Sequence, residues 1–217
     1  MSTLDLNTED RFPSIGTLDI ETSGFDGGSE HLIAVGVGYY KADGGDAEVA
    51  VHTQKDFDGD EAKLIRTTYE WLNERNPDAL TTYGGEGFDF EFLDDKQTAL
   101  GVSDGPDLAC RSNHIDLFEP RKSLADKRNN KWPSLEESLK SYEIPEYETT
   151  WRNAKLDNTM FGEELAPEYV AALEDGDTNT LDALETIVHE YTETDIEGNI
   201  ALYEHDVGRE YMPTYAR

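Results

Sequence analysis

Three segments near the start of the chain favour neighbouring β-strands. Residues 14–22, 31–42 and 47–53 are rich in Ile, Val, Leu and Tyr, and clusters of Gly, Asp and Ser separate them. Connections this short join antiparallel strands, whereas parallel strands need a long crossover. We therefore expect the fold to open with an antiparallel meander, which excludes an all-helical architecture.

Helical and extended segments alternate after this meander. Apolar residues recur at helical spacing between Asp60 and Asn76, and the dipeptide Asn76-Pro77 ends that pattern. Ser134 and Glu137 form the signature of a capping box at a later helix start. This order predicts an α/β fold, a mixed sheet that is antiparallel first and parallel afterwards and is flanked by helices. The expected helices are 60–76, 88–100, 134–142, 163–174 and 180–203, the expected strands are 79–83 and 114–118, and 119–132 is expected to be a loop.

The net charge of the chain indicates the solvent to which the protein is adapted more than the partners that it binds. The sequence holds 48 acidic and 18 basic residues, a formal net charge of −30 that is spread over its whole length. Such a domain repels itself in dilute buffer, and high salt screens the repulsion. The pattern resembles proteins of halophiles that accumulate salt, where nearly every surface is acidic whatever its function. The basic character that marks a nucleic-acid-binding protein must therefore be sought locally.

The sequence also bounds the compartment and the domain organisation. The longest apolar run, residues 32–40, is too short to span a bilayer, and residues 1–12 carry acids where a secretory signal is basic and apolar. We expect a cytoplasmic protein without membrane contact, one domain over residues 1–217 whose segment 1–12 is disordered or peripheral.

The lone Cys110 excludes an internal disulfide, and we expect no disulfide-linked partner. Its apolar neighbours favour a packed side chain over a nucleophile.

Asp19 and Glu21 form the first candidate site. They stand two residues apart in the first expected strand, so both side chains point to the same face. Two carboxylates on one face of an otherwise apolar strand are costly unless a cation neutralises them. In a chain this acidic such a pair also arises by chance, so the pair alone fits a solvated strand edge as well.

Two further acids stand in distinctive surroundings. A glycine-rich turn over residues 84–87 leads into Phe88 and Asp89, and aromatic residues crowd Asp89 on both sides. Tyr191 and Asp195 lie one turn apart on the same face of an expected helix. Each acid has a simpler explanation, because helix starts favour acids and helix surfaces tolerate them.

Taken in order, these patterns resemble the DEDD superfamily of 3′-to-5′ exonucleases, in its tyrosine-bearing branch. Residues 18–22 (LDIET) are similar to the first motif, residues 83–93 (YGGEGFDFEFL) to the second, and Tyr191-x-x-x-Asp195 to the third. The resemblance covers about residues 15–205. It implies a ribonuclease-H-like fold, similar to stand-alone bacterial and archaeal members and to the proofreading domain of family B polymerases.

The resemblance also implies a reaction. Asp19, Glu21, Asp89 and Asp195 would hold two divalent ions, and the Tyr191 hydroxyl would orient the attacking water. Hydrolysis of a phosphodiester needs charge stabilisation on the attacking and leaving oxygens, which two ions supply. Oxygen ligands select Mg²⁺ or Mn²⁺ over zinc. Orientation suits Tyr191 better than general-base catalysis, because a phenol is too weak an acid at neutral pH.

The chain departs from the family pattern at two places. Gly84 or Gly85 stands where many relatives have Asn, which puts the rate or the choice of substrate in doubt, though not the metal site. Asp206 is a rival to Asp195, but its tyrosine precedes it by three residues rather than four. We prefer Asp195, because the family spacing and the preceding helical pattern match Tyr191, and we expect Asp206 to be dispensable.

One segment contrasts with the acidic composition. Residues 121–131 hold five basic side chains and one acid. Lys and Arg there would contact a phosphate backbone without reading its sequence, and a neighbouring aromatic ring would stack on a base. A solvated loop paired with nearby acids is the simpler alternative. The candidate nucleic-acid contacts are Arg121, Lys122, Lys127, Arg128, Lys131 and Trp132, together with Thr22 and Phe88 from the first two motifs.

Three functions fit these residues. We favour a metal-dependent 3′-to-5′ exonuclease acting on single-stranded DNA or RNA. The alternatives are a non-catalytic nucleic-acid-binding or assembly module of the same fold and an endonuclease of ribonuclease-H type. The 3′-to-5′ direction of digestion rests on fold analogy alone. The sequence does not distinguish DNA from RNA as the substrate. It also does not distinguish a protein that acts alone from one that acts beside a polymerase or a helicase.

The net charge generates a prediction about folding. We expect the protein to lose most of its structure in dilute buffer and its melting temperature to rise with KCl into the molar range, because salt screens the repulsion. Circular dichroism melts over a KCl series measure this, with a series in an uncharged osmolyte as the control. A melting temperature that stays constant from dilute to molar KCl would contradict the role given to charge repulsion.

Overall fold

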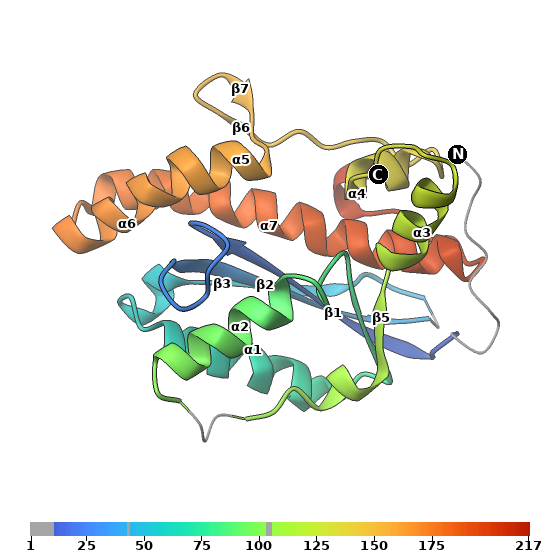
Figure 1. Ribbon diagram of the computed structural model, residues 1–217, viewed down its shortest axis with the longest axis horizontal. Helices are drawn as coiled ribbons and strands as arrows, with labels where there is room; N and C mark the ends of the chain where they lie inside the picture. The colour runs from blue at the N-terminus through green and yellow to red at the C-terminus, as the bar shows by residue number, and fades with distance from the viewer. Residues whose placement is uncertain (1–10, 43, 103–105) are drawn as a thin grey trace.

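A five-stranded mixed sheet organises the chain (Figure 1). The computed structural model describes residues 11–42, 44–102 and 106–217, so most of the expected N-terminal segment 1–12 lies outside the described residues. The strand order is β3-β2-β1-β4-β5, and β1 pairs antiparallel with β2 and parallel with β4. The predicted meander followed by parallel strands is confirmed. The strands are β1 Ser14–Thr22, β2 Leu32–Lys41, β3 Glu48–Thr53, β4 Ala79–Thr82 and β5 His114–Asp116.

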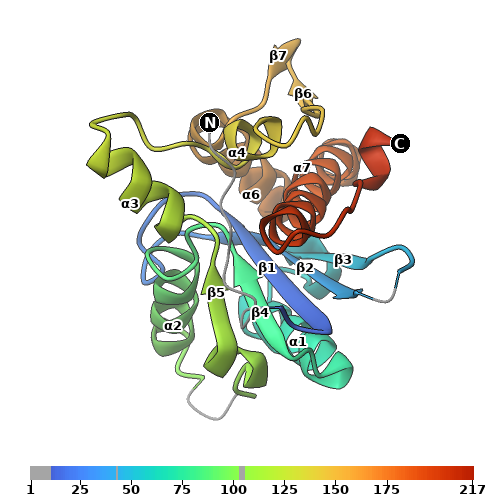
Figure 2. The same cartoon turned by 90° about the vertical axis from the view of Figure 1, so that its right-hand side faces the viewer.

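Helices cover both faces of this sheet (Figure 2). Helices α1 and α2 pack on one face, and α7 lies across the other with α4 and α6 beside it. The predicted capping box of α4 is present, with Ser134 and Glu137 bonding each other's backbone. The helices are α1 Glu61–Arg75, α2 Asp89–Ala99, α3 Glu119–Lys127, α4 Leu135–Lys140, α5 Asn158–Met160, α6 Ala166–Asp175 and α7 Thr178–Asp206.

Strand β1 divides its side chains between two apolar cores. Leu18 and Ile20 are buried among side chains of α1 and α2, whereas Ile15 packs with α7. Because strand side chains alternate, Asp19 and Glu21 share the face of Ile15. The apolar neighbours of the two acids therefore fix the strand, and the acids themselves are directed toward α7.

Two glycines in β2 allow α7 to lie close to the sheet. Gly36 pairs with Asp19 of β1, and Gly38 follows two residues later on the same face. A Cβ atom added at Gly36 would lie 2.6 Å from side-chain carbons of Thr192 and Ile196, and one at Gly38 would lie 2.8 Å from Ile196. Glycine inside a strand often marks such a close approach. Larger side chains here would push α7 away from β1.

The expectation of a loop over 119–132 is wrong, because residues 119–127 form helix α3. Arg121, expected to contact a phosphate backbone, is buried in this helix. Its guanidinium donates to Oδ1 of Asp206 at 2.7 Å and to the carbonyl oxygen of Leu117 at 2.7 Å. Asp206 also accepts a hydrogen bond from Tyr142. This ion pair joins residues far apart in the sequence and holds the helix, so local periodicity does not reveal it. Asp206, expected to be dispensable, is a structural residue.

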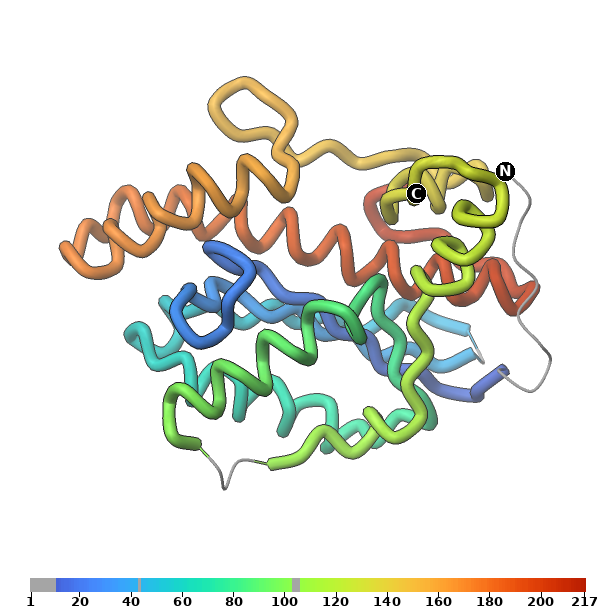
Figure 3. Tube along the Cα trace, in the orientation of Figure 1, coloured from blue at the N-terminus to red at the C-terminus, as the bar shows by residue number. Residues whose placement is uncertain are grey.

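The predicted helix 163–174 begins earlier than expected. Helix α5, a π-helical turn over Phe161–Leu165 and α6 follow one another without a break and run beside α7 (Figure 3). A small hairpin precedes them, formed by β6 Thr150–Trp151 and β7 Ala154–Lys155, which the sequence did not reveal.

Two expectations drawn from composition can be compared with the fold. Cys110 is buried in the core beneath α1 and α2, as expected for a packed side chain. Among the helices that the described residues form, none is both long and apolar enough to cross a bilayer.

The buried ion pair between α3 and α7 generates a prediction about stability. We expect Asp206→Ala to lower the free energy of unfolding by about 3–5 kcal/mol, because it leaves the Arg121 guanidinium buried without its counter-charge. Chemical denaturation in molar KCl measures this loss. Glu119→Ala, which removes the exposed partner of Lys122, is the matched control and should change stability little. An Asp206→Ala protein as stable as wild type would show that the pair does not hold α3.

Candidate active site

Three carboxylates meet where α7 crosses β1. Asp19 and Glu21 come from the strand and Asp195 from the helix, and one oxygen of each lies within 4.8 Å of the others. Asp19 and Asp195 are partly exposed, whereas Glu21 is buried. The close approach of α7 over the glycines of β2 brings Asp195 to this point.

Asp89 adds a fourth carboxylate from the start of α2. It is buried and lines a cavity of about 280 Å³ together with Asp19, Glu21 and Asp195. The glycine turn before it is braced by Asp116 of β5, which accepts hydrogen bonds from the backbone N–H of Gly84 at 2.9 Å and of Phe118 at 2.9 Å. Gly84 has a φ of 91°, a conformation that favours glycine over other residues. Local geometry thus explains a glycine in this turn.

These carboxylates hold their protons more tightly than isolated acids do. Burial raises the pKa of Asp19 to about 7. Burial also raises the pKa of Glu21 well above its ordinary value, and the charges of Asp19, Asp195 and Asp89 raise it further. The pKa values of Asp89 and Asp195 are raised for the same two reasons, burial first and then the charge of Asp19. The cluster therefore favours any ligand that brings positive charge.

Unsatisfied oxygens point to the same conclusion. Oε1 of Glu21 and Oδ2 of Asp89 are buried and have no hydrogen-bond partner in the structure. Buried carboxylate oxygens without donors are costly, and a cation at this position would satisfy them. The residues present therefore fit a divalent metal centre with oxygen ligands.

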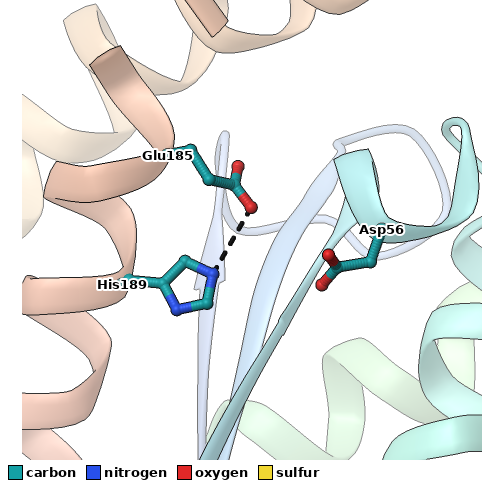
Figure 4. Close-up of side chains that lie close together, drawn as sticks. All are labelled: Asp56, Glu185 and His189. Carbon is teal, nitrogen blue, oxygen red and sulfur yellow. Dashed lines mark ion pairs between the residues drawn. The ribbon is translucent and has the colours of Figure 1, made fainter. Parts of the chain in front are cut away.

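A second group of side chains that could bind a metal consists of Asp56, Glu185 and His189, and it is built differently (Figure 4). Glu185 accepts hydrogen bonds from the hydroxyls of Thr53 at 2.6 Å and Tyr169 at 2.7 Å, and it contacts His189 at 3.4 Å. Asp56 accepts from the backbone N–H of Thr53 at 3.0 Å. Because these carboxylates already have donors, the group joins β3 to α6 and α7 without requiring an ion.

Tyr191 stands one turn before Asp195 on α7. Its ring stacks on Phe161 with centroids 5.5 Å apart, and its hydroxyl donates to Oδ1 of Asn158 at 2.6 Å. Burial and the nearby charges of Glu21 and Asp195 raise the pKa of the phenol further above its ordinary value. The hydroxyl therefore remains protonated at neutral pH.

Two of the four carboxylates, Asp19 and Asp195, also line a larger cavity of about 710 Å³. Asp19 and Asp195 line both cavities, as do Tyr83 and Asn158. Residues of α4 and of the β7–α5 segment form the rest of its wall. Asp19 and Asp195 thus lie where the two cavities meet.

Comparison with known proteins places this fold. A family model for the RNase_H superfamily matches residues 17–207. The chain belongs to the ribonuclease H superfamily. No curated protein matches its sequence.

Solved structures with a similar fold are larger than this ribonuclease H superfamily member. The family B DNA polymerase of the archaeon Pyrobaculum calidifontis is 16% identical, with a TM-score of 0.49, over 90% of this chain and 29% of the polymerase. Escherichia coli Exonuclease I in complex with a dT13 oligonucleotide is 14% identical, with a TM-score of 0.36, over 81% of this chain and 44% of that protein. The chain thus spans less than half of either protein, and the likeness concerns the fold.

The residues expected to contact nucleic acid divide into two groups in this ribonuclease H superfamily chain. Phe88 lines the smaller cavity, and the Thr22 hydroxyl beside it donates to the carbonyl of Gly24 at 2.7 Å. Lys122 lies over the rings of Phe118 and Trp132, at 5.7 and 5.2 Å from their centroids. The exposed side chains Lys127, Arg128 and Lys131 follow at the end of α3 and beyond it.

Sequence reasoning missed two residues of this site. Phe118 lines the smaller cavity and packs against Trp132 with ring centroids 6.0 Å apart, so it joins the carboxylates to the basic segment. Its place at the end of the expected strand 114–118 was the available signal. Asn158 carried no signal, because it precedes the expected helix and matches no motif.

The raised pKa values generate a prediction about pH. A carboxyl group with a higher pKa in the folded than in the unfolded state contributes stability that falls as pH rises from its unfolded to its folded pKa. For Asp19 this window runs from about 4 to about 7. We expect Asp19→Asn to stabilise the metal-free protein by about 2 kcal/mol at pH 8, about half of what the full shift would give because Asp19 is partly exposed, and to have little effect at pH 4.

Chemical denaturation with EDTA in molar KCl at both pH values measures this difference. Glu193→Gln, an exposed acid beside the site on α7, is the control and should show no such pH dependence. An equal effect of Asp19→Asn at pH 4 and pH 8 would refute a raised pKa at this carboxyl group.

Proposed function

We propose that the chain is a metal-dependent nuclease that removes nucleotides from the 3′ end of single-stranded DNA or RNA. The observation that carries the proposal is the set of four carboxylates around one cavity, three of them with oxygens within 4.8 Å of one another. Burial and mutual repulsion make this arrangement costly without a cation. The polarity and the single-stranded substrate rest on the resemblance of the motifs to tyrosine-bearing DEDD exonucleases.

Mg²⁺ or Mn²⁺ fits this donor set, because every ligand offers oxygen. Asp19, Glu21, Asp89 and Asp195 would hold two such ions, which supply positive charge at the scissile phosphate. The chain's own contribution is to fix the carboxylates on one strand and two helices that apolar cores hold in place. Rigid supports of this kind keep ligands in a productive geometry.

Tyr191 is proposed to orient the attacking water. Its hydroxyl keeps its proton at neutral pH, because burial and neighbouring acids raise the pKa of the phenol. A protonated phenol can hold a water molecule by hydrogen bonding and cannot remove its proton. Proton removal therefore falls to another group or to solvent.

The surroundings of the carboxylates suit an unpaired strand. Phe88 and Phe118 line the smaller cavity, and aromatic side chains bind unstacked bases of any sequence. Lys122 lies over Phe118. The exposed basic side chains of Lys127, Arg128 and Lys131 follow at the end of α3 and beyond it, where they would contact the phosphate backbone. Arg121 is excluded from this role by its buried ion pair. A cytoplasmic, salt-rich setting, as expected from the composition, belongs to the same proposal.

The proposal predicts which side chains cleavage requires. We expect Asp19→Ala, Glu21→Ala, Asp89→Ala and Asp195→Ala each to lower the cleavage rate at least ~100-fold, because each removes a ligand. The fold should persist, since removal of one repelling acid does not destabilise the metal-free protein. Digestion of end-labelled single-stranded DNA and RNA in molar KCl with Mg²⁺ or Mn²⁺ measures the rates. Glu193→Ala, an exposed acid on the same helix, is the control.

Two further measurements separate the alternatives. Cleavage of a circular single strand, which has no 3′ end, would identify an endonuclease. Calorimetric titration with Mn²⁺ of wild type and Asp19→Asn tests the metal site without any substrate. Binding of Mn²⁺ and of single strands without cleavage would identify a non-catalytic module of the same fold.

A further inference from the structure

One hydrogen bond ties the tyrosine of the candidate site to a segment outside its three motifs. The Tyr191 hydroxyl donates to Oδ1 of Asn158 at 2.6 Å, across 33 residues of sequence. Stacking on Phe161 fixes the plane of the same ring. Asn158 is thus the polar group that determines where the phenol directs its proton.

Asn158 occupies a well-supported position at the edge of the site. It is the first residue of α5, and Asp157 before it caps this helix by accepting from the backbone N–H of Met160 at 2.8 Å. Phe161, on which Tyr191 stacks, also donates its backbone N–H to the carbonyl oxygen of Asp157 at 2.8 Å. The support of the tyrosine ring and the support of the amide therefore come from one short segment.

The amide also faces the reacting space. Asn158 lines both the smaller and the larger cavity, and in each it is accompanied by Asp19 and Asp195. Its side chain is exposed rather than buried, so packing alone does not account for it. The hydroxyl of Tyr191 is linked to this space through its hydrogen bond to Asn158.

The chemistry of the two groups fixes the direction of the hydrogen bonds. A phenol has one proton to donate and lone pairs that accept, whereas an amide oxygen only accepts. When the proton of Tyr191 is directed to Asn158, the phenol oxygen can only accept a hydrogen bond from water. A water that donates to Tyr191 keeps its own lone pair available for attack on phosphorus.

Without this acceptor, the direction of the hydrogen bond between Tyr191 and the water is no longer fixed. The phenol proton is then free to be donated to the water itself. That hydrogen bond would occupy one of the two lone pairs of the water oxygen and turn the water relative to the phosphorus. The acceptor on Asn158 therefore distinguishes a productive from an unproductive orientation of the same water.

We propose that Asn158 is a positioning residue that takes the Tyr191 proton and thereby fixes the orientation of the reacting water. The inference rests on the proposed nuclease function and adds to it a residue from the β7–α5 segment. Asn158 acts only through Tyr191, so its contribution should vanish when the tyrosine hydroxyl is removed.

A double-mutant cycle tests this dependence. Asn158→Ala is expected to lower kcat about tenfold with little change in KM, the size of one well-placed hydrogen bond. In the background of Tyr191→Phe, the same substitution should cause no further loss, because the two residues act as one unit. Asn179→Ala, the same change at an exposed position in the first turn of α7, is the matched control and should leave kcat unchanged.

A spectroscopic measurement makes the contact testable without catalysis. With 3-fluorotyrosine in place of Tyr191, the ¹⁹F resonance of the metal-free protein should shift on Asn158→Ala and stay in place on Asn179→Ala. An unchanged resonance, an unchanged kcat, or a double variant slowed by the product of the two single effects would each overturn the inference. A wild type that cleaves nothing but shows the expected ¹⁹F shift would instead overturn the proposed function, and the catalytic part of the inference with it, while establishing the contact.

Discussion

Repulsion between like charges in a poorly solvated space is the constraint on which the site depends. One oxygen each of Asp19, Glu21 and Asp195 lies within 4.8 Å of the other two, and Oε1 of Glu21 has no hydrogen-bond partner in the structure. What holds them together is packing behind them. Leu18 and Ile20 anchor β1 on one face of the sheet, and Ile196 anchors α7 on the other. The free energy that brings the acids together comes from the two cores.

Most buried charges elsewhere in the described residues have an oppositely charged partner, and Glu197 instead accepts hydrogen bonds from the backbone N–H and the hydroxyl of Thr214. Lys96 lies 3.1 Å from Glu61, Arg121 lies 2.7 Å from Asp206, and Arg209 lies 2.6 Å from Glu204. In each pair the opposite charge offsets the cost of burying its partner. The carboxylates around the smaller cavity have no such basic partner, and this difference separates a site from the structural acids of a highly acidic chain.

Local signals in the sequence were sufficient for most of the sheet and for the start of α4. Alternation and turn residues predicted β1 to β3, and the Ser134 capping box predicted the start of α4, because these features depend on neighbours in the chain. Helix α3 was missed because its ion pair spans 85 residues. Asn158 was missed for the same reason, since its partner Tyr191 lies 33 residues away. The motifs brought the four acids to attention, but only the fold shows that they surround one cavity.

The glycines beneath α7 also bear on how this lineage can change. A single methyl group at Gly36 would lie 2.6 Å from side-chain carbons of α7 and force the helix away from β1. A substitution at this position would therefore separate the acids without replacing any of them. Two acids two residues apart arise easily by chance in a chain this acidic, whereas a glycine inside a strand often marks a close approach of another segment. Among distant homologues, glycine opposite the first acid is therefore a sharper marker of an intact centre than the acid itself.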